Sequence, residues 1–85
     1  MKFKATIQVM PREEILDPQG KATLQGLHNL GYHLFGHVRI GKRIEMEVEA
    51  TDAESAKAAV GEACKKLLAN TVIEQFAFDV EALSA

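Results

Sequence analysis

The feature that most constrains the fold is the strict alternation at residues 43–50, RIEMEVEA. The even positions from Ile44 to Ala50 are apolar, and the odd positions are Arg43 followed by three glutamates. A period of two is typical of a β-strand with one buried face. A slip of one residue would bury four charged side chains, so the register is firmly set. The chain must therefore build a sheet that has one apolar face.

Two further alternating segments, residues 2–10 and 71–80, predict strands at the two ends of the chain. Pro11 ends the first strand because it has no N–H for a ladder hydrogen bond. In the second segment Ile73 breaks the parity of the residues that follow, so this strand bulges or begins late. The tail at 81–85 is expected to fray.

A short additional strand is predicted at residues 37–40. Gly41 and Lys42 would then form a tight hairpin between this strand and residues 43–50, with Gly41 supplying the positive φ that such a turn needs.

Two helices are predicted, at residues 17–30 and 51–69. In the first, Asp17 is a suitable N-cap and Pro18 fits the first helical position, where its missing N–H costs nothing. Gly31 is a good left-handed stop.

The second helix starts with a capping box in which Thr51 and Glu54 satisfy each other's backbone donors. Asn70 would close it in the left-handed conformation. Its apolar stripe has three- and four-residue spacing and consists of Ala56, Val60, Ala63, Cys64, Leu67 and Leu68.

The element order is therefore β-α-β-β-α-β in a single domain, residues 1–85. We expect an α+β fold: a two-layer sandwich with a four-stranded, mainly antiparallel sheet and two helices on one face. The other face of the sheet would stay uncovered and would be a natural surface for dimerisation.

Charge and composition narrow the functional classes. The net charge is −2, which argues against a general nucleic-acid binder. Residues 1–43 have a net charge of +4 and residues 44–85 a net charge of −6. This asymmetry fits either pairing of opposite charges, within the chain or with another subunit, or simply solvated faces. The apolar runs are too short to cross a membrane, and the start of the chain alternates instead of forming the apolar block of a signal peptide, so we expect a cytoplasmic protein.

Three groups of side chains are of types that can carry chemistry. His33 and His37 are four residues apart, but their segment is rich in glycine and offers no clear third ligand for a metal. Cys64 lies late on the apolar stripe, so a buried structural thiol is favoured over a nucleophile. The glutamate row at residues 45–49 is better explained as the solvated edge or outer face of a strand, where some of the glutamates could pair with Lys2, Lys4 or Arg43 across strands. We therefore expect no catalytic residue, metal ligand or cofactor-binding residue in this chain.

Four segments in a fixed order resemble a known family. They are LDPQGK at 16–21, LGY at 30–32, VRIGK at 38–42 followed by Ile44, and CKKLLANTVIE at 64–74. In these segments and in length the chain resembles the small S subunit of phosphoribosylformylglycinamidine synthase (the PurS family). The resemblance covers essentially the whole chain. Its least distinctive stretch is HLFGH at 33–37.

The resemblance implies a non-catalytic subunit of a C–N ligase complex in purine biosynthesis that uses ATP with magnesium and glutamine. A large synthetase subunit and a glutaminase subunit would be its partners. The small subunit would bridge them for assembly and ammonia transfer, as a homodimer or higher homo-oligomer. Two other classes stay open, a dimeric small-molecule-binding regulatory module and an unrecognised enzyme.

Four polar residues of these segments have no evident core role and are the candidate partner interface: Gln19, Lys21, Arg39 and Lys42. Ordinary solvent exposure explains each of them equally well. We expect Arg39→Glu to weaken complex assembly while leaving the isolated fold intact.

Overall fold

The computed structural model describes residues 1–83 and contains one three-stranded antiparallel sheet. The strands are β1 (Lys2–Pro11), β2 (Lys42–Glu49) and β3 (Glu74–Ala82), in the order β2-β1-β3. The alternation at residues 43–50 is thus confirmed as a strand. Ile7 of β1 lies opposite Ile44 of β2 and Phe78 of β3. This register places the apolar parities of all three strands on one face.

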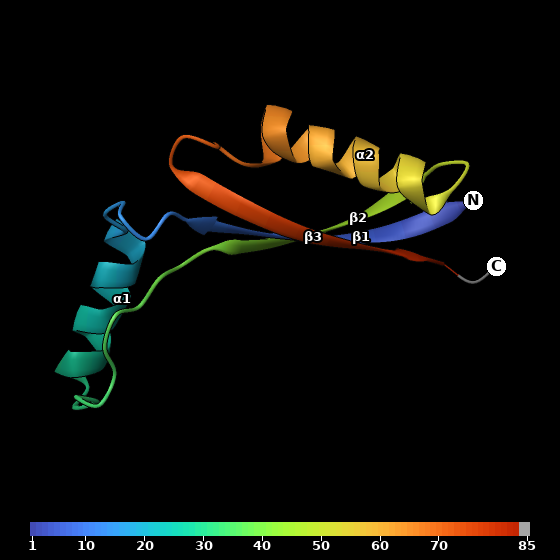
Figure 1. The fold of residues 1–85 in the computed structure, drawn as a ribbon. Helices are drawn as coiled ribbons and strands as arrows, with labels where there is room; N and C mark the ends of the chain where they lie inside the picture. The colour runs from blue at the N-terminus through green and yellow to red at the C-terminus, as the bar shows by residue number, and fades with distance from the viewer. Residues whose placement is uncertain (84–85) are drawn as a thin grey trace.

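The core lies between this apolar face and α2 (Ala53–Ala63) (Figure 1). Ile7 and Val9 of β1 are almost fully buried, as are Val60 of α2 and Cys64 just after it. The apolar side chains of the two outer strands are only half-buried, because a single helix is too narrow to cover three strands. The opposite face of the sheet carries polar side chains, as the alternation predicted.

The α2 helix differs from prediction at its start. Asp52, rather than Thr51, is the N-cap, and its Oδ1 accepts the N–H of Ser55 at 2.8 Å. The proposed capping box of Thr51 and Glu54 is therefore wrong by one residue. Both Thr and Asp are good caps, so the sequence pattern alone does not choose between them.

The helix continues into a π-helical turn, η1 (Cys64–Leu68), in which Ala69 N–H donates to Cys64 O at 2.9 Å. The wider turn changes the angular phase of the side chains. As a result Leu67 is 83% exposed, although an unbroken stripe predicted its burial. The end does not use a left-handed Asn70 either. Within residues 1–83, His37 is the one residue other than glycine with a positive φ.

The last strand begins late and extends further than predicted. It starts at Glu74, because residues 71–73 form a turn in which Asn70 Oδ1 accepts the N–H of Val72 at 3.2 Å. Glu81 and Ala82 pair with Lys4 and Phe3, so the predicted tail does not fray at these two positions. Residues 84–85 of that tail lie outside the described residues.

The predicted fourth strand at residues 37–40 is wrong. β1 already has β2 and β3 as its two neighbours, and it ends at Pro11. Residues 37–40 run beyond that end, beside α1 (Pro18–Asn29). The tight hairpin predicted at Gly41 and Lys42 is therefore also wrong. Gly41 has no positive φ, and it is needed because a Cβ there would lie 2.4 Å from Val9 O.

Helix α1 begins and ends as predicted, with Asp17 as N-cap, Pro18 in the first turn and Gly31 at φ +93°. Its predicted position is wrong. Instead of covering the sheet, α1 and its return segment project from one end of it as an arm, residues 12–41 (Figure 1). The radius of gyration is 16.7 Å, against about 12 Å for a compact domain of this length. The molecule is therefore elongated, with extents of 51 × 29 × 14 Å.

Candidate partner-binding shoulder

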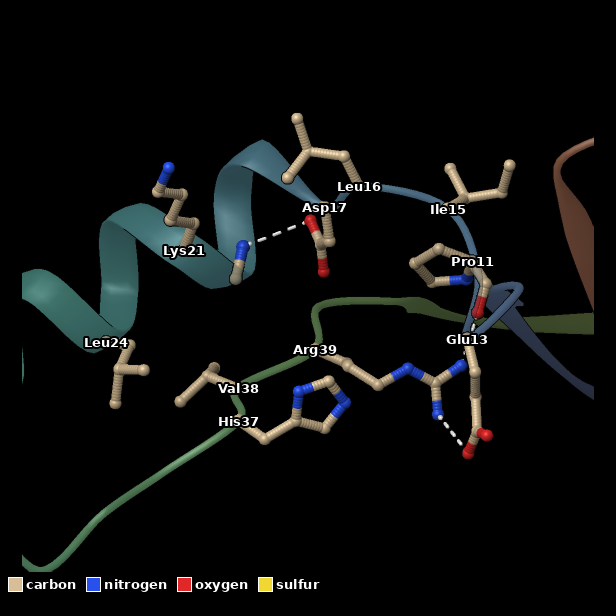
Figure 2. Close-up of a pocket in the computed structure, with 11 residues that line it drawn as sticks. Pro11, Glu13, Ile15, Leu16, Asp17, Lys21, Leu24, His37, Val38 and Arg39 are labelled. Carbon is tan, nitrogen blue, oxygen red and sulfur yellow. Dashed lines mark hydrogen bonds and ion pairs between the residues drawn. The ribbon is translucent and has the colours of Figure 1, made fainter.

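Two of the segments that carry the family resemblance meet where the arm leaves the sheet. We call this region the shoulder, residues 11–21 and 37–42. Asp17 holds it together through both of its carboxylate oxygens, and Figure 2 shows the side chain between α1 and the return segment. Oδ1 accepts the N–H of Gly20 at 3.0 Å, and Oδ2 accepts the N–H of Ile40 at 2.7 Å. One side chain therefore starts α1 and fastens the returning chain to it.

Gly20 allows the two segments of the shoulder to touch. It is the one buried residue of α1, and a Cβ at this position would lie 2.1 Å from Val38 O. Real Cβ atoms do not approach a backbone oxygen so closely, so glycine is required here for space. The contact brings the first turn of α1 directly against the return segment.

Arg39 ties the return segment to the end of β1. Its guanidinium donates to Pro11 O and lies 3.7 Å from the Glu13 carboxylate (Nη1 to Oε1). The side chain is 22% exposed. Arg39→Glu would therefore remove contacts within the shoulder, and we no longer expect it to leave the isolated fold unchanged.

A hollow of about 250 Å³ lies within the shoulder, between the start of α1, the loop after β1 and the return segment (Figure 2). Much of its lining is apolar, from Pro11, Ile15, Leu16, Leu24 and Val38. The polar residues of the lining are Glu13, Asp17, Lys21, His37 and Arg39.

The carboxylates of the hollow are engaged within the protein. Glu13 faces Arg39, and the backbone N–H groups of Ile40 and Gly20 hold the pKa of the Asp17 carboxyl below its usual value. The formal charges of the lining cancel, and Lys21 is the cation of the lining that is left without an ion pair among residues 1–83.

The structure brings together two of the four candidate interface residues. Lys21 and Arg39 line the hollow, from α1 and from the return segment. Gln19 and Lys42 are exposed but do not line it. Sequence reasoning missed the apolar lining, although Leu16 and Val38 lie inside the segments that it singled out. It weighed His37 only as a metal ligand and did not predict its place in the lining or its φ of +48°, which is unusual for a residue with a side chain.

The other side chains that could carry chemistry are buried or are bound to groups elsewhere in the protein. Cys64 is buried as expected, and burial raises the pKa of its thiol. Glu45 pairs with Lys4 of β1 at 3.8 Å, as expected, and with Arg43 of its own strand at 3.1 Å, whereas Glu49 pairs with the N-terminal amine at 3.1 Å. His28, on the arm, contacts Phe35 O through Nε2 at 3.0 Å. In the described part of the chain, no three His, Cys, Asp or Glu side chains are grouped so as to hold a metal.

No helix among residues 1–83 is long and apolar enough to cross a membrane.

Comparison with known proteins gives a consistent result along the whole chain. Residues 4–82 match the family model described as PurS, phosphoribosylformylglycinamidine (FGAM) synthase. The PurS subunit of Bacillus subtilis is 42% identical over 83 residues, 98% of each chain. That of Synechocystis is 44% identical over 81 residues, 95% of this chain and 81% of the relative.

Solved structures agree with the sequence comparison. A crystal structure of Bacillus subtilis PurS superposes with a TM-score of 0.86 at 42% identity, covering 94% of this chain and 99% of the other. A chain in the structure of PurLQS from Thermotoga maritima gives a TM-score of 0.86 at 33% identity, with coverage of 95% and 99%. This chain therefore belongs to the PurS family, the PurS subunits of phosphoribosylformylglycinamidine synthase.

Proposed function

We propose that this chain bridges a large synthetase subunit and a glutaminase subunit of phosphoribosylformylglycinamidine synthase, for assembly and ammonia transfer in purine biosynthesis. The observation that carries the proposal is the full-length match to a chain of the Thermotoga maritima PurLQS structure, at a TM-score of 0.86. The elongated shape supports it, because an arm and a sheet at opposite ends can contact different neighbours. The protein would act in the cytoplasm.

The chemistry is assigned to the partners, with ATP and magnesium bound in the large subunit. The titratable groups of this chain with shifted pKa values have structural explanations: Asp17 and Asp52 cap helices, and Cys64 is buried. An assembly subunit would serve the reaction by excluding water. Ammonia released in solution is protonated and loses its nucleophilicity, whereas transfer through closed interfaces limits proton uptake.

We also propose that the chain works as a homodimer or higher homo-oligomer. The apolar side chains of β2 and β3 are half-buried, and the arm exposes Leu30, Leu34 and Tyr32 by 75%, 80% and 51%. Exposed apolar surface on this scale is typical of interaction sites. A second copy, placed so that its arm covers the half-open sheet, would bury both surfaces at once. Analytical ultracentrifugation over a range of concentrations tests this, and a monomer throughout would contradict it.

The function is tested by measuring amidine formation by the large subunit and the glutaminase, with and without this chain. The nitrogen source is either glutamine or ammonium. We expect glutamine-driven turnover to need the chain and ammonium-driven turnover to be largely independent of it. If neither rate responds, the bridging role is wrong. Thermal stabilisation of the isolated chain by a metabolite would then favour a regulatory module.

A further inference from the structure

We propose that the hollow of the shoulder receives an apolar side chain flanked by carboxylates, presented by another protein subunit of the complex. This inference rests on the proposed function and names the chemistry of the partner surface. It assigns the hollow to a different protein, since the homo-oligomer proposed above would use the apolar sheet face and the tip of the arm and would leave the hollow open.

The size and lining of the hollow favour an apolar side chain. Its volume is about 250 Å³, and a dry apolar cavity of about 150 Å³ is enough to hold benzene. Leu24 of α1 and Val38 of the return segment face each other across it (Figure 2). Leu16, at the start of α1, is 73% exposed. A branched or aromatic side chain of a partner would bury these groups together.

The charges around the hollow favour carboxylates beside that side chain. Glu13 lies 3.7 Å from Arg39, and Asp17 stays ionised while it accepts two backbone N–H groups, so the two carboxylates and two cations of the lining cancel in formal charge. Lys21 is exposed on the α1 side, without an ion pair among residues 1–83. Over residues 11–43 the chain carries five basic and three acidic side chains, a balance of +2.

Three hydrogen bonds hold the shoulder in shape around the hollow. Asp17 and Arg39 bind the three sides of the hollow to one another, at Ile40, Gly20 and Pro11. A receptor site held in shape before binding does not lose free energy to ordering when the partner arrives. The hollow is thus a preformed binding site at the base of the arm.

The experiment uses two matched pairs of variants of the full chain. Lys21→Glu reverses the available charge, and Lys57→Glu on the exposed surface of α2 makes the same change away from the shoulder. Val38→Phe fills the hollow, and Val72→Phe adds the same ring at a site that is 80% exposed and outside the hollow lining. Circular dichroism and thermal unfolding first establish that each variant folds. Lys21→Glu changes only an exposed side chain and stays informative if Val38→Phe does not fold.

Binding to the purified large subunit and to the purified glutaminase is then measured by calorimetry at low and high salt. We expect Lys21→Glu and Val38→Phe to weaken binding to one of the two proteins at least tenfold, with both controls within twofold of wild type. Added salt should reduce the difference in binding affinity between Lys21→Glu and Lys57→Glu, because salt screens exposed charge pairs. A folded Lys21→Glu or Val38→Phe that binds as well as its control overturns the inference while leaving the bridging role intact. Wild-type chain that binds neither protein overturns both.

Discussion

The Asp17 carboxylate accepts the N–H of Ile40 at 2.7 Å across 23 positions of sequence. Its other oxygen accepts the N–H of Gly20, three residues away, at 3.0 Å. A local helix cap and a long-range tertiary contact thus share one side chain. The packing of α1 beside the return segment depends on this joint, whereas the arm is tied to the sheet through the contact of Arg39 with Pro11 O at the end of β1.

Replacing Asp17 by Asn should loosen the joint without melting α1. An amide keeps one acceptor oxygen and replaces the other with a donor, so it can satisfy only one of the two N–H groups. Asn is also a good N-cap, so we expect the Gly20 bond to persist and the Ile40 bond to be lost. Amide hydrogen exchange by NMR should show faster exchange at Ile40 and little change at Gly20. Asp79→Asn on the polar sheet face is the control, and equal protection of Ile40 in all three proteins would contradict the prediction.

Acid should weaken the joint in a defined direction. Hydrogen bonds from Ile40 and Gly20 hold the pKa of Asp17 below the reference value of 3.8. A carboxyl with a depressed folded-state pKa contributes stability that is fully present above its unfolded pKa and is lost as the pH falls through the folded pKa. We therefore expect the Ile40 amide to stay protected at pH 5 and to lose protection below pH 3.8. Asp17→Asn should remove that dependence. Protection lost already near neutral pH would show that another group controls the joint.

Gly20→Ala should strain the shoulder, because its Cβ would lie 2.1 Å from the backbone oxygen of Val38. Overpacking of this kind costs typically about 1–3 kcal/mol. Gly26 is the matched control on the same helix, since a Cβ there meets nothing within 4 Å. Gly26→Ala should stabilise by up to about 1 kcal/mol through helix propensity. Urea unfolding measures both changes, and small-angle scattering shows whether the arm moves. A Gly20→Ala protein as stable as Gly26→Ala would rule out the steric requirement.

The sheet could be predicted from sequence because burial imposes a period of two over eight or more residues. At residues 43–50 a register slip would bury Arg43 and three glutamates, and this penalty leaves one solution. Residues 37–40 are too few for the same test. An extended segment beside a helix and a short strand have the same local sequence pattern. In the structure, residues 37–40 are an extended segment and not a strand.

The position of α1 could not be predicted for a related reason. The stripe of Leu24 and Leu27 requires some apolar neighbour, and the sequence does not say which. The return segment provides it, through Val38 and the close approach at Gly20. The candidate site was found only in part. Lys21 and Arg39 were selected by resemblance, whereas the tertiary role of Asp17 was hidden because capping alone explained the residue.

Ile7→Ala should be among the most destabilising single changes. Ile7 is fully buried at the centre of β1, opposite Ile44 and Phe78. Truncating a buried Ile to Ala typically costs about 2–5 kcal/mol. Ile44→Ala on the outer strand, where the side chain is half-buried, should cost less. Urea denaturation of both proteins at fixed concentration provides the comparison. If Ile44→Ala proves the more costly, a second copy must bury that edge, and the concentration dependence of unfolding would reveal it.

Cys64 should be unreactive in the folded protein. Its side chain is fully buried at the junction of α2 and the π-helical turn, and burial raises the pKa of the thiol. Because the thiolate is the reactive species, both exclusion of reagent and the raised pKa slow the reaction. With a thiol-specific chromophore at pH 8, we expect labelling to be slow in buffer and fast in urea, following the unfolded fraction. The control is the double variant Ser55→Cys, Cys64→Ala, whose exposed cysteine should label rapidly in buffer. Rapid labelling of native Cys64 would mean that the π-helical turn opens on its own, and the labelling rate would then measure how often it does so.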